Sequence, residues 1–354
     1  MKRARLLKTL FLLVTLSTVF AVTALAFVTD IPDQLQGLVG RYESHNGNHI
    51  LLRENQGTLE LLREAEKDFQ GEKVEFRGIV YQVITMEIVA EAPLSLAGTV
   101  EDREHHMSAE IDARGFGVIC WLNGEPFERV FYGPELGLGL RIEAIDDPES
   151  LRQRALDASP PAQPHGLRQP DLVNLEELDI PMIIDIRYAT EDNFMGIVLY
   201  PDNLAFLQRP AAEALEKAAA ELERMGLGLV VYDAYRPWYV TKMFWDATPQ
   251  ELRGFVANPA YGSRHNRGCA ADLGLYWLDT GEYVEMPSGF DEFSERAYPD
   301  YPGGMQHQRD ARDLLIEVMK DAGFSVYEDE WWHFDFYLWQ EYPIINIDFE
   351  EILQ

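Results

Sequence analysis

The sequence predicts an α+β protein with two domains: a small all-β domain, followed by a larger domain whose central antiparallel sheet is flanked by helices. Two observations support this. Up to about residue 145, short apolar segments are separated by turn signals such as Asn46-Gly47 and Asn123-Gly124. Beyond a proline-rich stretch, segments with helical length and period alternate with short apolar strands. A chain of 354 residues is long enough for two such domains.

The first 26 residues are expected to be a targeting segment. Basic residues at Lys2 and Arg3 precede the apolar run 10–22, and Ala24-Leu25-Ala26 offers the small residues that a signal peptidase recognises. An uncleaved N-terminal membrane anchor is the alternative, because a membrane span needs ~20 apolar residues. In both cases we expect an extracytoplasmic protein that is secreted, periplasmic, or anchored with its folded part outside.

Residues 27–146 are expected to form the all-β domain, as a sandwich or a barrel-like sheet. Strands are predicted at 49–53, 58–62, 74–89, 94–100, 117–122 and 138–145. His105 and His106 stand beside several carboxylates, and we interpret them as part of a polar loop between strands. No catalytic chemistry is predicted for this domain, and the sequence does not indicate what it binds.

Residues 147–170 are expected to be a linker, because this stretch contains several prolines and few large apolar residues. The last domain, 171–354, mixes both kinds of element. Helices are predicted at 210–225 and 308–322, each followed by a glycine, and strands at 229–232, 268–278 and 332–339.

The charge of the chain excludes one class of partner. Thirty basic and sixty acidic residues give a formal net charge of −30, which repels the phosphates of nucleic acids, so no nucleic-acid partner is expected. The two cysteines, Cys120 and Cys269, fall in different predicted domains. We interpret both as buried free thiols.

The predicted strand 268–278 presents one carboxylate among very small residues. Side chains alternate between the two faces of a strand, so Asp272 shares a face with Ala270 and Gly274. These small neighbours leave space beside the carboxylate for an ion and a substrate. Cys269 points to the opposite, apolar face, and we therefore assign it to the core and not to a metal site.

Two imidazoles and a carboxylate in this domain match the donor set of a catalytic zinc site, which uses three protein ligands and leaves the fourth position for water. His265 precedes Asp272 by an odd number of residues, so a flat strand would separate them, and a bend is predicted at Gly268. The same alternation separates Glu330 from His333. We expect Glu330 at a turn before its strand, beside the metal without binding it.

The pattern Ser-x-His-x-x-Gly-x-Ala-x-Asp at 263–272, followed by Glu-x-Trp-His at 330–333, resembles the signature of the zinc D-Ala-D-Ala metallopeptidases. Within that family, three further motifs resemble the D-alanyl-D-alanine dipeptidases of the vancomycin-resistance type. They lie at 187–194, 233–237 and 289–293. The resemblance runs from about residue 174 to the end of the chain and does not cover the β domain.

The resemblance implies a role for each matching residue. His265, Asp272 and His333 match the ligands of one zinc ion, and Glu330 matches the general base. Arg236 matches the cation that stabilises the oxyanion. Asp291 matches the carboxylate that receives the free ammonium group of the substrate. Ser263 and Tyr188 match residues that line the substrate pocket, and Asp233 matches a supporting residue beside Arg236.

Three interpretations of the function follow from the sequence. The first is an exported zinc dipeptidase that hydrolyses D-Ala-D-Ala, a small D,D-dipeptide. The second is a D,D-carboxypeptidase or endopeptidase that acts on the stem peptides of peptidoglycan. The third is a non-enzymatic wall-binding protein with a structural zinc site, which the presence of Glu330 and Arg236 disfavours because a structural site needs neither. The resistance-type dipeptidases that the chain resembles are generally cytoplasmic, whereas the N-terminal pattern of this chain predicts export. Salvage or turnover of cell-wall D-amino acids is therefore expected in place of resistance.

Overall fold

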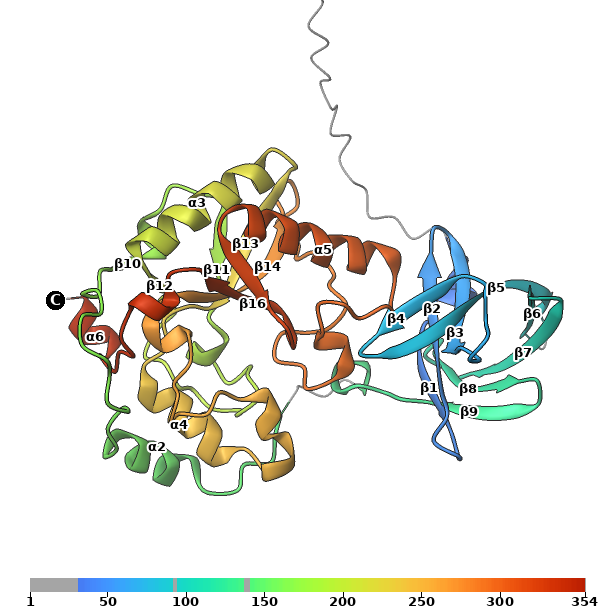
Figure 1. The fold of residues 1–354 in the computed structure, drawn as a ribbon, viewed down its shortest axis with the longest axis horizontal. Coiled ribbons are helices and arrows are strands. Elements are labelled where there is room, and N and C mark those ends of the chain that lie inside the picture. The colour runs from blue at the N-terminus through green and yellow to red at the C-terminus, as the bar shows by residue number, and fades with distance from the viewer. Residues whose placement is uncertain (1–30, 92–93, 137–140, 354) are drawn as a thin grey trace, which may run out of the picture.

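The computed structural model describes residues 31–91, 94–136 and 141–353. A β barrel lies beside a mixed α/β domain along the long axis of the molecule (Figure 1). The predicted targeting segment, residues 1–26, lies outside the described residues. Within the described part of the chain, no helix has the length and the apolar character that crossing a membrane requires.

The N-terminal domain is an antiparallel barrel. Its strands follow the order β3-β2-β1-β9-β8-β7-β6-β5, and a further pairing of β3 with β5 closes the ring, with β4 attached outside to β5. The strands are β1 (Gly40–Ser44), β2 (His49–Asn55), β3 (Thr58–Glu64), β4 (Lys73–Phe76), β5 (Ile79–Glu91), β6 (Leu94–Val100), β7 (Arg103–Ile111), β8 (Gly117–Leu122) and β9 (Glu125–Arg129), and the short helix α1 (Asp33–Gln36) precedes them.

Apolar side chains fill the barrel. Leu52, Ile84, Leu96 and Cys120 are among the residues buried in its core, and Cys120 is a free thiol as predicted. Side chains along each strand point alternately into and out of the barrel. Short segments in which every second residue is apolar are therefore enough to fill the core. Because closure pairs the edge strands with each other, the ring exposes no free edge that could pair with another chain.

The structure corrects three predictions for this domain. The predicted strand 74–89 is interrupted by a turn at Arg77-Gly78. His105 and His106 belong to β7 and not to a loop. Side chains alternate along this strand, so His105 is buried and His106 is exposed. The predicted strand 138–145 is also not observed, since 141–145 form no strand and 137–140 lie outside the described residues. The β3–β5 pairing closes the ring of eight strands, so no further strand is needed there.

The proline-rich stretch 147–170, predicted as a linker, contains a helix. α2 (Pro148–Leu156) begins at Asp147, whose side chain accepts a hydrogen bond from the Ser150 amide, and Leu151 and Ala155 are buried against the second domain. An acidic N-cap followed by proline at the first helical position is a helix-start signal. The prolines after this helix are typical of a linker, but they lie beyond its last residue and do not interrupt it.

The second domain is built on a five-stranded sheet with the order β11-β13-β14-β16-β15. It is a mixed sheet and not the purely antiparallel one predicted, because β11 runs parallel to β13. Its strands are β11 (Met182–Ile184), β13 (Leu227–Asp233), β14 (Ala270–Trp277), β15 (Phe324–Tyr327) and β16 (Glu330–Phe336), and a separate pair is formed by β10 (Leu172–Asn174) and β12 (Phe206–Gln208).

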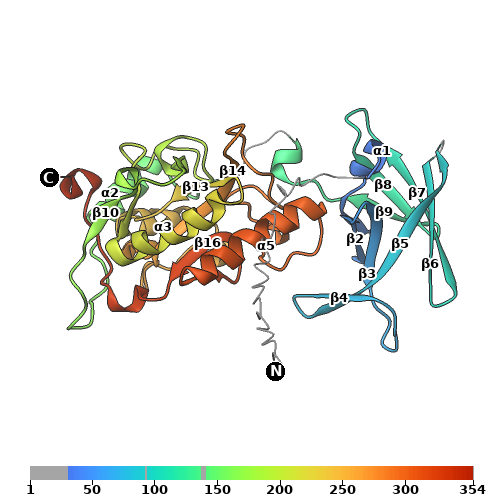
Figure 2. The same ribbon diagram turned by 90° about the horizontal axis from the view of Figure 1, so that it is seen from above.

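The helices of this domain are α3 (Arg209–Glu223), α4 (Trp238–Ala247), α5 (Gln306–Asp321) and α6 (Phe349–Ile352). α3 and α5 pack against each other and against the sheet, while α2 and α4 pair at the opposite side of the domain (Figures 1 and 2). Short 3-10 turns lie at η1 (Gly133–Leu136), η2 (Leu175–Glu177), η3 (Arg187–Ala189), η4 (Gln250–Phe255), η5 (His265–Arg267), η6 (Glu295–Ala297) and η7 (Trp339–Glu341).

Candidate active site

Three neighbouring strands bring polar side chains into one row. Asp272 on β14 is paired with His333 on β16 and with Asp233 at the end of β13. The β13–β14 register shifts between Val231 and Asp233, at the place where the row of polar residues begins. All three polar residues are buried. A cluster of this kind inside a sheet requires partners for its charges.

His265 reaches the row from a turn. It lies in η5, which ends at Gly268 with a φ of 65°, in the left-handed region that glycine adopts without steric cost. This is the bend that the spacing between His265 and Asp272 predicts. Cys269, directly after it, is fully buried in the core, as the alternation argument requires.

The side chains of His265, Asp272 and His333 converge on one point. The Nε2 atom of His265 lies 3.1 Å from Nδ1 of His333 and 3.3 Å from Oδ1 of Asp272, and the last two atoms are 3.1 Å apart. Ligand atoms around a tetrahedral zinc ion with bonds of about 2.0–2.1 Å lie roughly 3.3 Å apart. Oδ1 of Asp272 is buried and accepts no hydrogen bond. This geometry and the unsatisfied oxygen fit a metal ion.

In each imidazole, the ring nitrogen that points away from the common point has a hydrogen-bond partner. This contact directs the other ring nitrogen towards the common point. Nδ1 of His265 lies 2.6 Å from the carbonyl oxygen of Ala234, and Nε2 of His333 lies 3.0 Å from Oδ1 of Asp335. Each outer N–H donates to an oxygen, so the lone pair of each ring faces the site. Such partners fix the tautomer and orientation of metal-binding histidines.

Arg236 is held beside the cluster by Asp233. Its Nε donates to Oδ2 of Asp233 over 2.9 Å, and a terminal nitrogen lies 2.7 Å from the same oxygen. Tyr200 donates to the other oxygen of Asp233 over 2.8 Å. The guanidinium also lies 3.8 Å from Asp272, and the rings of Tyr188 and Phe244 face it. It is therefore a fixed cation at the edge of the site.

Glu330 is the first residue of β16 and directly follows the turn at 328–329. The sequence predicted it at the turn before the strand, but the strand begins two residues earlier than predicted and includes it. Its Oε2 lies 3.7 Å from Nδ1 of His333, and its side chain is 20% exposed. Burial raises the pKa of Glu330 to about 7, and the negative charge of Asp272 adds to the rise. A carboxylate with this pKa can accept a proton near neutral pH.

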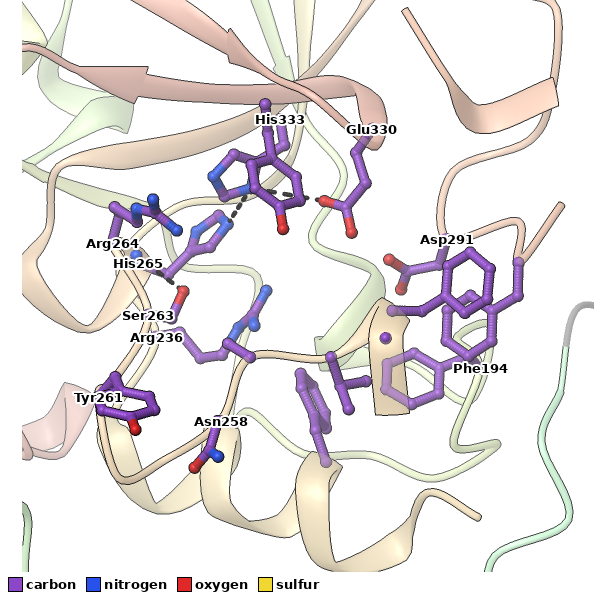
Figure 3. Close-up of a pocket in the computed structure, with 18 of the residues that line it drawn as sticks. Phe194, Arg236, Asn258, Tyr261, Ser263, Arg264, His265, Asp291, Glu330 and His333 are labelled. Carbon is purple, nitrogen blue, oxygen red and sulfur yellow. Dashed lines mark hydrogen bonds and ion pairs between the residues drawn. The ribbon is translucent and has the colours of Figure 1, made fainter. Parts of the chain in front are cut away.

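Asp291 lies on the far side of the cavity from His265, with its carboxylate toward Glu330 (Figure 3). Tyr188 donates a hydrogen bond to its Oδ2 over 2.7 Å. Burial raises the pKa of Asp291 well above its ordinary value, against the hydrogen bond from Tyr188. Among the described residues Asp291 forms no ion pair, and an ammonium group in the cavity would provide one.

These residues surround one cavity with a volume of ≈ 280 Å³. Glu330 and His333 lie along one side, His265, Ser263 and Arg236 lie next to one another, and Asp291 and Phe194 lie across the cavity from them (Figure 3). Ser263 Oγ accepts a hydrogen bond from the His265 amide, and Tyr188 contributes its buried ring. The structure thus brings together all nine residues singled out in the sequence. The cavity has room for a small ligand.

Three further residues of the site were missed in the sequence analysis. Asp335 binds His333, Tyr200 binds Asp233, and the ring of Tyr327 lies 5.5 Å from that of His333. Asp335 lies two residues after His333 on β16, so strand alternation could have found it. Tyr327 ends the neighbouring strand β15 and is paired with Glu330, a pairing that depends on the hairpin turn at 328–329. Tyr200 reaches the site from a distant segment and left no local signal.

Replacing Asp335 by Ala is expected to weaken zinc binding about 10- to 100-fold, because His333 loses the acceptor that orients its ring. Competition with a chelator of known affinity measures this. Asp321→Ala, which removes an exposed carboxylate from α5, is the matched control. Equal zinc affinity in the two variants would contradict the role of Asp335.

Comparison with known proteins connects this site to a family. A family model described as D-ala-D-ala dipeptidase matches residues 168–343. The D-alanyl-D-alanine dipeptidase of Escherichia coli K12 is 35% identical over 179 residues, which is 51% of this chain and 91% of that protein. The chain belongs to the D-Ala-D-Ala dipeptidase family. It is therefore an enzyme, a metallopeptidase of a family that is zinc-dependent in general.

Other members of the family show the same coverage. The D-alanyl-D-alanine dipeptidase of Enterococcus faecium is 35% identical over 187 residues, 47% of this chain and 90% of that protein. A protein of the same name from Enterococcus faecalis V583 is 34% identical over 171 residues, 42% of this chain and 83% of that protein. The family match begins at residue 168, so the barrel, β1–β9, lies outside it.

A solved structure of an LD-carboxypeptidase aligns with 49% of this chain and 69% of its own chain. The TM-score is 0.25 and the sequence identity is 16%.

Proposed function

We propose that this chain is an exported, zinc-dependent dipeptidase that hydrolyses D-Ala-D-Ala. The observation that carries the proposal is the arrangement of charges in one small cavity. A buried donor set for zinc lies beside Glu330 and Arg236, and across the cavity the carboxylate of Asp291 accepts a hydrogen bond from Tyr188 but forms no ion pair with any described residue. Family membership supports the reaction type, and the cavity supports a short substrate.

The residues that would hold the zinc ion are His265, Asp272 and His333. A zinc ion bound there would lower the pKa of a bound water to about 7 and polarise the peptide carbonyl. Glu330, beside this donor set and outside it, is placed to take the proton of the attacking water and to return it to the leaving amine. Its raised pKa suits both steps.

Arg236 is placed to stabilise the negative charge that develops on the carbonyl oxygen. The ion pair with Asp233 fixes the guanidinium before the substrate arrives, so no reorganisation is needed during the reaction. Tyr200 in turn holds Asp233. A cation that is positioned in advance in a buried site is effective because few water molecules screen it.

Asp291 is proposed to select substrates by length. A free dipeptide carries an ammonium group that can pair with this carboxylate, whereas a longer or N-acylated peptide carries a neutral amide there and leaves the charge unpaired. Rejection of a substrate that leaves a buried polar group unpaired is strong. This argument favours a dipeptidase over an enzyme that acts on the longer stem peptides of peptidoglycan.

Replacing Asp291 by Asn is expected to lower kcat/KM for D-Ala-D-Ala about 30-fold, which corresponds to roughly 2 kcal/mol for the loss of one charged partner. Asn is a suitable replacement because it tolerates the positive φ of 57° at this position. Steady-state kinetics measure the change, and N-acetyl-D-Ala-D-Ala serves as the control substrate because it has no ammonium group. A large loss on the acetylated peptide as well would contradict the proposed role.

The proposal is tested by hydrolysis of D-Ala-D-Ala and L-Ala-L-Ala with the purified protein, with bound zinc quantified. We expect turnover of the D,D-dipeptide, one zinc ion per chain, and loss of activity after chelation that added zinc restores. Absence of turnover by the zinc-loaded protein would overturn the proposal. Hydrolysis of N-acylated stem peptides without hydrolysis of the free dipeptide would indicate a D,D-carboxypeptidase.

Export is a separate part of the proposal and rests on the basic and apolar pattern of the first 26 residues. Fractionation of the native host, with N-terminal sequencing of the mature protein, tests it. We expect the protein outside the cytoplasm, cleaved near Ala26 or retained at the membrane by an intact N-terminus. A cytoplasmic protein with an intact N-terminus would contradict export and would leave the enzymatic proposal unaffected.

A further inference from the structure

The β4–β5 hairpin of the barrel points its tip at the peptidase domain (Figures 1 and 2). Phe76 pairs with Ile79, which leaves Arg77 and Gly78 as a two-residue turn. Both have positive φ, 49° and 80°, as in the tight turns whose twist matches that of the paired strands. The turn therefore gives the backbone of Arg77 a defined position at the domain junction.

On one side, Arg77 contacts the turn that precedes the proposed general base. Its guanidinium donates hydrogen bonds to the carbonyl oxygen of Glu328 and, over 2.9 Å, to Oδ1 of Asp329. These two residues form the turn between β15 and β16, and Glu330 follows directly. A shift of this turn would therefore move the Glu330 carboxylate relative to the metal ligands.

On its other side, Arg77 contacts the segment that begins at Asp291. Its guanidinium lies 3.7 Å from the ring centroid of Tyr298, and Nε lies 3.7 Å from Asp300. The neighbouring Phe76 packs against the rings of Tyr298 and Tyr301, with centroids 5.9 Å and 5.8 Å away. One barrel residue thus contacts both segments that carry the proposed base and the proposed ammonium-binding group.

A second connection leads from the barrel to Asp291 through ion pairs. Arg129 on β9 lies 3.0 Å from Glu135, and Glu135 lies 3.7 Å from Arg296. Arg296 makes two hydrogen bonds, of 2.6 Å and 2.7 Å, to the buried carboxylate of Glu292. Glu292 directly follows Asp291, whose positive φ is uncommon for a residue with a side chain. Such a conformation persists where the surroundings hold it.

The contact between the barrel and the peptidase domain is well packed, so the barrel can hold the adjoining segments of the peptidase domain in place. Leu51, Leu62, Phe76 and Tyr81 of the barrel form one buried cluster with Tyr301 of the peptidase domain.

Buried polar contacts accompany this apolar cluster. The side chain of Glu54 on β2 accepts a hydrogen bond from the Gln306 amide over 2.6 Å, and its carbonyl oxygen accepts one from Arg309 over 2.7 Å. Contacts of this kind fix one orientation, since each buried polar group needs its partner.

From these contacts we infer that the barrel is a positioning domain for the active site, and that Arg77 is a positioning residue for the segments of Glu330 and Asp291. Arg77 does not contact the cavity and takes no part in the chemistry. It sets the distance between the base and the ammonium-binding carboxylate. The inference rests on the proposed function, because Arg77 is expected to affect catalysis through the roles proposed for Glu330 and Asp291.

Kinetics of Arg77→Ala in the full chain test the inference. A displacement of 1 Å in a catalytic group can lower the rate by about 10²-fold, so partial release of the two segments is expected to lower kcat/KM for D-Ala-D-Ala about tenfold. The loss should divide between a lower kcat, through Glu330, and a higher KM, through Asp291. Zinc content and the unfolding temperature should stay close to those of the unmodified chain.

Two variants make the result specific. Arg103→Ala removes an exposed arginine that pairs with Glu66 within the barrel, and it is expected to leave kcat and KM unchanged. Arg77→Lys keeps the charge but cannot bind two acceptors in the plane of a guanidinium, so its kinetics should be intermediate.

Unchanged kcat and KM in folded Arg77→Ala would overturn the inference. If that variant does not fold, Asp329→Ala removes the side-chain acceptor of Arg77 from the peptidase side. Unchanged kcat in folded Asp329→Ala would also overturn the inference. Failure of the proposed function is distinguishable, because in that case the unmodified, zinc-loaded chain is itself inactive on D-Ala-D-Ala.

Discussion

Replacing Glu330 by Gln is expected to lower kcat for D-Ala-D-Ala by about 10²- to 10⁴-fold, the range found when a general base is removed. Gln has nearly the same shape but cannot take a proton from water. Zinc content should be unchanged, because Glu330 lies outside the donor set formed by His265, Asp272 and His333. Single-turnover kinetics and zinc quantification on the same preparation measure both quantities.

The neighbouring carboxylate provides a matched control for this substitution. Glu328 is exposed in the turn directly before Glu330, so Glu328→Gln removes the same charge two residues away without touching the cavity. We expect full activity in this variant. Turnover by Glu330→Gln at the rate of the control would contradict the role of Glu330 as the base.

Replacing Arg236 by Lys is expected to lower kcat/KM by about 10²- to 10³-fold, the typical effect of removing one donor that stabilises an oxyanion. Lys keeps the positive charge beside the buried Asp233, which limits the loss of stability that an unpaired charge would cause. It cannot reproduce the two contacts that the guanidinium makes with Asp233. The cation is therefore no longer held toward the substrate.

Thermal unfolding of Arg236→Lys separates a catalytic effect from a structural one. We expect a folded protein with zinc bound and with the loss confined to turnover. Arg253→Lys is a suitable control, since Arg253 also lies over an aromatic ring, that of Trp245, but does not line the cavity. Activity of Arg236→Lys equal to that of this control would rule out oxyanion stabilisation by Arg236.

Local rules of strand geometry explain why much of the site could be predicted from sequence. Alternation along 268–278 turned Cys269 into the core and left Asp272 on the other face, and the structure confirms the burial of Cys269. The odd spacing between His265 and Asp272 required a bend, which Gly268 provides. These features depend on neighbouring residues of one segment, and their physical causes are therefore visible in the sequence.

Pairing between distant segments could not be predicted in the same way. Closure of the barrel depends on β3 meeting β5, and the parallel pairing of β11 with β13 joins strands that are separated by α3. The contacts of Arg77 with the peptidase domain join residues far apart in the chain. No local pattern encodes such contacts, because each depends on how the whole chain packs.

The most direct test of the central claim is the ratio of kcat/KM for D-Ala-D-Ala to that for N-acetyl-D-Ala-D-Ala, measured on the zinc-loaded chain. The two substrates share the scissile bond and differ in the ammonium group that Asp291 is proposed to bind. We predict a ratio of at least about 10², because the acetylated peptide leaves a buried carboxylate without its partner. A ratio near one, or preference for the acetylated peptide, would contradict a length-selective dipeptidase.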